Sequence, residues 1–167
     1  WTDEWGAQVC RNEFDFVDNH MYWDHPHFLG GSWQLPSRGG NGGGSAIRAG
    51  GAGLHVAASR LIDKPFTITE FHFVPPNPYR AESGLLYGAW AAIQDWSGLY
   101  RFSYSGSAKN TFTPEPLSFF DVVNDPITQI AEYAAVALFI RRDLPAAHHA
   151  IVVAGTEAEF MAKAHDR

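Results

Sequence analysis

The chain has 167 residues, of which 46% are apolar and 14% aromatic, a composition typical of a globular protein and not of a disordered one. Twelve basic residues against 18 acidic ones give a net charge of −6, which argues against a nucleic-acid partner because phosphate recognition needs a basic surface. No run is long and apolar enough to cross a membrane, and the single cysteine, Cys10, permits no internal disulfide.

The first predicted element is a strand over residues 14–23 that ends in polar and aromatic groups. His20 and Tyr22 share one face of this strand because side chains alternate with a period of two. A glycine-rich stretch follows from residue 30 to residue 53, and a modest helix is expected at 52–62. The glycines at 39–44 lie well past the strand and precede no Lys-Ser/Thr pair, so we interpret them as a flexible loop and not as a phosphate-binding loop.

The second predicted strand, within residues 64–73, delivers a carboxylate near its end. Pro65 opens the run KPFTITEFHF, and the segment PPNP at 75–78 closes it. Alternation places Ile68, Glu70 and His72 on one face. In α/β enzymes the carboxyl ends of buried parallel strands carry the chemistry, so Glu70 is a candidate catalytic group, the structural alternative being an ion pair with a nearby arginine.

The remaining elements alternate in type. We expect a strong helix over residues 80–96, a third strand over 99–104 that ends at Tyr104, and a helix over 126–142 capped by the Asn-Asp-Pro sequence at 124–126. A last strand at 150–153 and a short helix at 157–164 complete the prediction.

Strands and helices that alternate in this way predict a parallel α/β fold. Functional side chains and long loops follow the same ends of all three strands, which favours part of a (β/α)₈ barrel over a doubly wound sheet. We expect a barrel portion over residues 1–145 and a short α/β tail or the start of an accessory segment over 146–167.

The predicted strand ends bring together a carboxylate, an imidazole and a phenol. His20 and Tyr22 can donate hydrogen bonds that hold Glu70 ionised and aimed, which suits attack on the anomeric carbon of a sugar. Aromatic rings that could stack on sugar faces also fall at strand ends or in loops: Trp23, Trp33, Trp96 and Tyr104.

Three separated motifs resemble the last three strands of clan A glycoside hydrolases, with cellulases and mannanases the nearest comparison. The motifs are DNHMYWDHP at 18–26, TEFHFVPPNPYRAE at 69–82, and a strand that ends in an aromatic residue, here Tyr104 where the family usually has Trp. The resemblance covers about residues 14–142. It implies a retaining mechanism with Glu70 as nucleophile, positioned by His20 and Tyr22. We expect the substrate to contact Trp23, His25, Trp33, His72, Asn77 and Tyr104.

Retaining hydrolysis also needs a general acid/base about 5–5.5 Å from the nucleophile. The Asn12-Glu13 pair has the right residue types, but it lies too close before the first strand to end another strand of the barrel. Glu82 is a second candidate, although its place in the first turn of a helix explains it equally well. We therefore expect the acid/base and the first five strands upstream of this chain, since a complete barrel takes roughly 250 residues.

Two other functions stay open. The aromatic residues could bind glycan without turnover, as in a carbohydrate-binding module. A metal-dependent hydrolase could use the cluster around His20, Asp24 and His25. We expect no cofactor, a polysaccharide or oligosaccharide as the partner, and no membrane or nucleic-acid partner. The resemblance suggests a secreted or periplasmic location.

Overall fold

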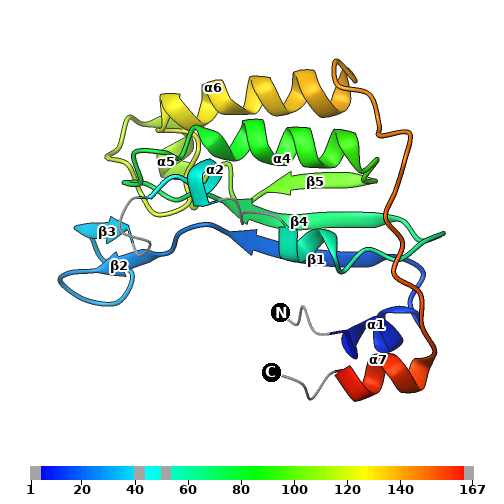
Figure 1. Ribbon diagram of the computed structural model, residues 1–167. Coiled ribbons are helices and arrows are strands. Elements are labelled where there is room, and N and C mark those ends of the chain that lie inside the picture. The colour runs from blue at the N-terminus through cyan, green and yellow to red at the C-terminus, as the bar shows by residue number, and fades with distance from the viewer. Residues whose placement is uncertain (1–4, 40–43, 50–53, 164–167) are drawn as a thin grey trace.

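A three-stranded parallel sheet forms the centre of the molecule. A computed structural model describes residues 5–39, 44–49 and 54–163. Strand β4 (Phe66–His72) lies in the middle and pairs in parallel with β1 (Val17–Tyr22) on one side and β5 (Gly98–Arg101) on the other (Figure 1). The three carboxyl ends therefore lie at one edge of the sheet, as predicted, and the mixed α/β class is confirmed.

One face of the sheet is covered by α4 (Glu82–Ile93), which the sequence predicted as 80–96. The ring of Phe71 stacks on Tyr87 with 4.7 Å between centroids, and Phe66 packs against Trp96 at 5.2 Å. These side chains are almost fully buried in one apolar core. Trp96, which we counted among rings for sugar stacking, is therefore a core residue.

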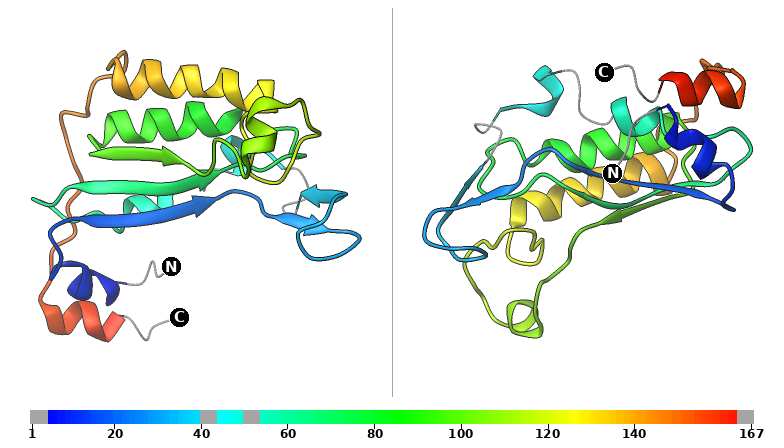
Figure 2. Two further views of the ribbon diagram at one scale, coloured as in Figure 1. Left: turned by 180° about the vertical axis from the view of Figure 1, so that it is seen from behind. Right: turned by 90° about the horizontal axis from the view of Figure 1, so that it is seen from below.

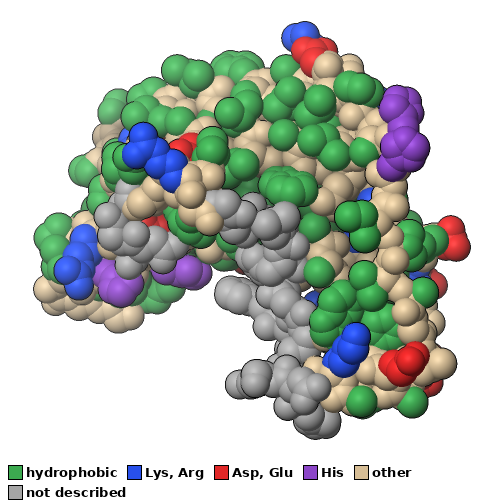
Figure 3. All heavy atoms as spheres, viewed as in Figure 1, with side chains coloured by type: hydrophobic (Ala, Val, Ile, Leu, Met, Phe, Trp, Pro, Cys, Tyr) green, Lys and Arg blue, Asp and Glu red, His purple; other side chains and the backbone are tan. Residues whose placement is uncertain are grey.

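Helix α6 (Pro126–Ala135) packs on α4, and the π-helix η1 (Val136–Ile140) continues it to two residues before the predicted end at 142 (Figures 1 and 2). The predicted cap is confirmed, because the Asp125 side chain accepts a hydrogen bond from the backbone N–H of Ile127 at 3.2 Å. Figure 3 shows apolar side chains gathered on the outer surface over these helices, and Ile130 and Tyr133 are 69% and 76% exposed.

The pairing register shifts once in each ladder, between Asn19 and His20 in β1 and between Ile68 and Phe71 in β4. Phe66 and Ile68 face the helix-covered core, and so does Phe71, although it lies three positions after Ile68, an odd number that regular alternation would place on the other face. The prediction that Ile68 and Glu70 share a face is therefore wrong, because the irregularity at residues 69–70 changes the alternation.

The segment from residue 26 through the glycine-rich stretch contains structure that was not predicted from sequence. A two-stranded antiparallel hairpin, β2 (Pro26–Phe28) and β3 (Ser37–Gly39), projects beyond the carboxyl end of β1 (Figure 1). Short helices α2 (Ala46–Ala49) and α3 (Leu54–Ala57) follow. The predicted flexible loop at 39–44 and the start of the predicted helix at 52–62 lie partly outside the described residues.

The first and last helices of the described chain lie together away from the sheet. Helix α1 (Ala7–Arg11) packs against α7 (Glu157–Lys163), and the Trp5 and Phe160 rings lie 5.9 Å apart (Figure 1). The predicted helix at 157–164 is confirmed over its described part, whereas the predicted strand at 150–153 is wrong, because this exposed segment joins no sheet. Within the described ranges, no helix has the length and apolar character needed to cross a bilayer.

Candidate active site

The site lies where β1 and β4 run side by side toward their carboxyl ends. His20 of β1 is the register partner of Glu70 in β4, so the backbone places their side chains next to each other. This arrangement could be anticipated from sequence only if the two strands were neighbours and parallel, which the structure shows.

Two side chains of β1 hold the Glu70 carboxylate. The Tyr22 hydroxyl donates a hydrogen bond to Oε2 of Glu70 at 2.7 Å, and Nδ1 of His20 lies 3.4 Å from the same oxygen. Burial, and then the hydrogen bond to Glu70, raise the pKa of Tyr22 well above its ordinary value, so the phenol stays a donor. The predicted contact between this pair and Glu70 is confirmed.

Asp18 fixes His20 from the other side, through Thr69. The Thr69 hydroxyl donates to Oδ2 of Asp18 at 2.6 Å, and Thr67 donates to Oδ1 at 2.7 Å. Because Thr69 has only one hydroxyl hydrogen, its oxygen accepts from His20, whose Nε2 lies 3.0 Å away. This network assigns a proton to Nε2 of His20 and turns Nδ1 toward Glu70.

The site is open to solvent on the face of the sheet opposite α4. The side chains of His20 and Glu70 are 23% and 31% exposed, so a ligand can reach the carboxylate from this face. A carboxylate aimed by donors and accessible from one side can act as a nucleophile or as an electrostatic partner for a cationic transition state.

Aromatic rings surround Tyr22. His25, which is exposed, lies 4.9 Å from the Tyr22 ring, and Phe120 lies at 5.4 Å and Phe102 at 6.3 Å. Neither phenylalanine was predicted from sequence as a site residue. Phe102 could have been predicted, because it directly follows the third strand. Phe120 could not, because it lies in a long loop whose path cannot be predicted from the local sequence.

The three aromatic residues predicted to contact sugar, Trp33, Trp23 and Tyr104, lie in different surroundings. Trp33 lies between the two strands of the β2–β3 hairpin and is 60% exposed. Trp23 instead packs against Phe73 of the core and donates its Nε1–H to the carbonyl of Gly44 at 3.0 Å, so its predicted sugar contact is not supported. Tyr104 is 64% exposed but does not end the third strand, because β5 stops at Arg101.

His72 was predicted to contact substrate, and this is wrong because its side chain is fully buried. Arg101 donates to Nδ1 of His72 at 3.0 Å and also binds Ser83 and Glu132. The ring of Phe120 lies 6.1 Å from His72 and covers it. Burial first, and the charge of Arg101 second, lower the pKa of His72 to about 3.

Asn77 is also buried, so its predicted contact with substrate is wrong. Its Nδ2 donates to Oδ2 of Asp24 at 3.2 Å, and its Oδ1 accepts from the backbone N–H of Tyr79 at 2.8 Å. Asn77 therefore ties the proline-rich loop after β4 to the segment after β1. The hydrogen bond between Asn77 and Asp24 is buried, so neither side chain faces solvent.

The side chains of His20, Asp24 and His25, considered above as alternative metal ligands, do not point toward a common position. Asp24 is 2% exposed and engaged with Asn77 and with the backbone N–H of His25, while His20 points to Thr69 and Glu70. Over residues 5–39, 44–49 and 54–163, no three His, Cys, Asp or Glu side chains gather as metal ligands would. The region around His20, Asp24 and His25 is thus a hydrogen-bonded framework in the part of the chain that is described.

Glu82, the second candidate for an acid/base, has a structural role. Its carboxylate accepts hydrogen bonds from Ser45 Oγ at 2.6 Å and from the backbone N–H groups of Ala46 and Ile47 at 2.8 and 3.1 Å. It therefore caps α2, and its oxygens are occupied by donors of the protein itself.

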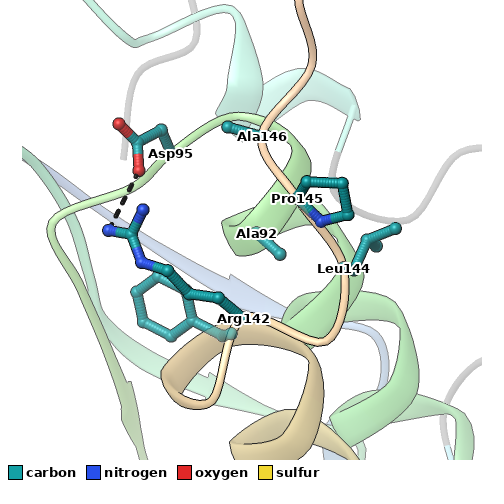
Figure 4. A pocket seen from close by; sticks show the side chains of 7 residues that line it. Ala92, Asp95, Arg142, Leu144, Pro145 and Ala146 are labelled. Carbon is teal, nitrogen blue, oxygen red and sulfur yellow. Dashed lines mark ion pairs between the residues drawn. The ribbon is translucent and has the colours of Figure 1, made fainter.

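A cavity of about 160 Å³ lies far from Glu70. It is bounded by the end of α4, η1 and the segment after η1, and an ion pair of 3.5 Å between Arg142 and Asp95 crosses its rim (Figure 4). Asp95 lies just before β5 begins, which places this cavity at the amino edge of the sheet. Glu70 lies toward the opposite, carboxyl edge.

Searches of family models, curated proteins and solved structures found no match for this chain.

Proposed function

We propose that this chain is the carboxyl-terminal part of a retaining glycoside hydrolase with a (β/α)₈ barrel, and that Glu70 is its nucleophile. The observation that carries the proposal is the Glu70 carboxylate held by Tyr22 at 2.7 Å and flanked by His20 at 3.4 Å on the open face of the sheet. These are the residues and roles that the resemblance to clan A glycoside hydrolases implies.

The arrangement of layers supports the barrel. Helices cover one face of a parallel sheet, and the opposite face carries His20 and Glu70 in the carboxyl-terminal halves of β1 and β4. In a barrel the outer face packs on helices and the active site collects at the carboxyl ends of the strands. Additional strands beside β1 and β5 would close such a barrel around Glu70.

The proposed reaction has two displacements. An oxygen of Glu70 forms a bond to the anomeric carbon while the glycosidic C–O bond breaks and the leaving oxygen takes a proton from a general acid. In the second displacement, the residue that served as general acid takes a proton from water. The water oxygen then bonds to the anomeric carbon, the bond between that carbon and Glu70 breaks, and the carboxylate is regenerated. Tyr22 donates to Oε2 of Glu70 and His20 flanks the same oxygen, so together they keep the carboxylate aimed at the carbon.

The general acid/base is proposed to come from a strand that precedes this chain. Glu13 is exposed and lies before β1, at the edge opposite Glu70. Glu82 is occupied with α2. Neither is placed to stand about 5–5.5 Å from Glu70 across a sugar, as a retaining pair requires.

The variant Glu70→Ala in the full-length protein tests the nucleophile. Turnover of β-glucan or mannan should fall by about 10⁴-fold or more, while glycan binding stays nearly unchanged, because the nucleophile acts in the transition state. The matched control is Glu13→Ala, an exposed carboxylate at the other edge, which should retain full turnover.

Unchanged turnover in Glu70→Ala would rule out the nucleophile assignment. If the unaltered protein bound glycan and never cleaved it, the binding-module alternative would replace the hydrolase. Loss of turnover on chelation, with Glu70→Ala still active, would instead favour a metal-dependent hydrolase.

A further inference from the structure

The cavity of about 160 Å³ at the amino edge of the sheet has an apolar interior. Ala92 is almost fully buried near the end of α4, Phe139 of η1 packs against the apolar core, and Leu144 continues the lining. The backbone N–H of Ala147 donates to the carbonyl of Ile93 at 2.9 Å, which fastens the segment after η1 to α4. Because an apolar cavity of about 150 Å³ can hold a benzene ring, this one can hold an apolar group of similar size.

One cation and one anion stand at the rim of this cavity. Nη2 of Arg142 lies 3.5 Å from Oδ1 of Asp95, and the two side chains are 73% and 60% exposed. Figure 4 shows Asp95 and Arg142 on one side of the cavity and Leu144 and Pro145 on the other. An ion pair this long and this exposed contributes little to stability, so a ligand can separate the two charges easily.

The backbone holds both charged residues in a conformation that glycine usually adopts. The φ angles of Asp95 and Arg142 are 51° and 60°, in the left-handed region. Asp95 follows the C-cap residue of α4 and Arg142 follows that of η1, and glycine is the most frequent residue at this position after a helix. Left-handed conformations of other residues are concentrated at ligand-binding and catalytic positions. Two helix ends thus present opposite charges to one cavity.

These groups match the parts of a free apolar amino acid. The guanidinium of Arg142 can bind a carboxylate through two parallel hydrogen bonds, and the carboxylate of Asp95 can accept hydrogen bonds from an ammonium group. In an α-amino acid both charges are attached to the same carbon atom, which suits two rim groups that lie 3.5 Å apart. A ligand with only one charge would leave either Arg142 or Asp95 without a partner on the ligand.

We propose that this cavity binds a free apolar α-amino acid, with its carboxylate on Arg142, its ammonium group on Asp95 and its side chain in the apolar interior. Because Glu70 lies toward the opposite edge of the sheet, this is a second site whose ligand does not compete with a ligand of Glu70. The inference does not depend on the proposed function.

An NMR titration of the full-length protein at pH 7 compares L-phenylalanine with analogues that each lack one part. Phenylpropanoate lacks the ammonium group, phenylethylamine lacks the carboxylate, and glycine lacks the side chain. L-Phenylalanine should bind with a Kd of about 0.1–1 mM, as expected for a ligand of few atoms. Each analogue should bind at least about tenfold more weakly, because it leaves one part of the site unused.

The variants Arg142→Gln and Asp95→Asn test the two charges, and each should weaken L-phenylalanine binding at least about tenfold. The matched controls are Arg141→Gln and Asp143→Asn, which remove an exposed ion pair of 2.6 Å between residues that do not line the cavity. Both controls should bind L-phenylalanine as the unaltered protein does. All these positions are exposed, so the variants should keep their melting temperatures, which verifies that any loss of binding is not a loss of folding.

Equal binding of L-phenylalanine by Arg142→Gln, Asp95→Asn and the two controls would overturn the inference. Phenylpropanoate or phenylethylamine binding as tightly as L-phenylalanine would overturn it as well, because one of the two charges would then have no role. The same holds if the unaltered protein binds no L-phenylalanine at concentrations up to about 10 mM. Glu70→Ala should bind L-phenylalanine normally, so the titration and the turnover assay can fail separately.

Discussion

The two imidazoles His20 and His72 lie on neighbouring strands with opposite surroundings. His20 is partly exposed beside Glu70, whereas His72 is fully buried against Arg101 and beneath Phe120. The pKa of His72 is lowered to about 3, chiefly by burial and next by the charge of Arg101, from an ordinary value of 6.5. His72 is therefore neutral in the folded protein at physiological pH, and it accepts a hydrogen bond from Arg101.

This lowered pKa predicts a pH dependence of stability. Between pH 6.5 and pH 3 the unfolded chain binds a proton at His72 and the folded chain does not, so stability is lost as pH falls through this window. From pH 7 to pH 5 the contribution of His72 should amount to about 2 kcal/mol. Urea unfolding at both values should show that His72→Gln, which keeps a side-chain acceptor, loses that much less than the unaltered protein.

The matched control for this prediction is His148→Gln, because His148 is exposed. The pKa of Asp125 is lowered from 3.8, so the stability that this carboxylate contributes is lost only below the window from pH 7 to pH 5. A pH dependence in His72→Gln identical to that of His148→Gln would contradict the assignment of a neutral, buried His72.

At the scale of elements, α4 and α6 approach so closely that their contact needs small residues. A Cβ added at Gly84 would lie 2.0 Å from the carbonyl oxygen of Ala131, and one added at Gly88 would lie 2.6 Å from the Cα of Ala135. Gly84 and Gly88 are four residues apart, as are Ala131 and Ala135, so both pairs face each other one helical turn apart. The two helices can thus pack backbone against backbone.

Gly88→Ala should therefore destabilise the protein, although alanine is the better helix former by about 1 kcal/mol. The added methyl group must push α6 away, and overpacking of this kind costs about 1–3 kcal/mol. Urea unfolding measures the difference. Gly30→Ala is the control, because nothing lies within 4 Å of the Cβ that it adds, and its effect should stay within about 0.5 kcal/mol. A Gly88→Ala protein of unchanged or higher stability would show that the helices do not approach this closely.

At the scale of the molecule, the described sheet leaves two edges without partners. β1 and β5 each pair only with β4 in the described residues. Helices α6 and η1 also expose Ile130, Tyr133 and Ile140, whose side chains are 68–76% exposed. Unpaired strand edges and apolar patches favour association with other chains.

Residues 1–167 expressed alone should consequently be catalytically inert, marginally stable and prone to associate. Size-exclusion chromatography, thermal melting and assays with β-glucan and mannan measure these three properties. A monomer that melts cooperatively and cleaves either glycan would contradict the prediction, because it would place a complete pair of carboxylates within this chain.

Elements with strong local signals could be predicted from sequence. The alternating run at 66–72 between prolines is a strand, and the cap at Asp125 begins a helix. The β2–β3 hairpin escaped prediction because its strands have three residues each and contain Pro, Ser and Gly, which carry no alternating pattern. The end of β5 was placed three residues too late, at Tyr104, because aromatic residues that favour strands continue past Arg101.

The sequence by itself determined that His20, Tyr22 and Glu70 fall near strand ends, because the spacing of apolar residues and prolines bounds each strand locally. Only the tertiary structure decided which polar groups face a ligand. The irregular register near Glu70 changed which residues share its face, and Phe120, from a distant loop, covered His72. Burial depends on such contacts between residues far apart in the chain, and no local pattern encodes them.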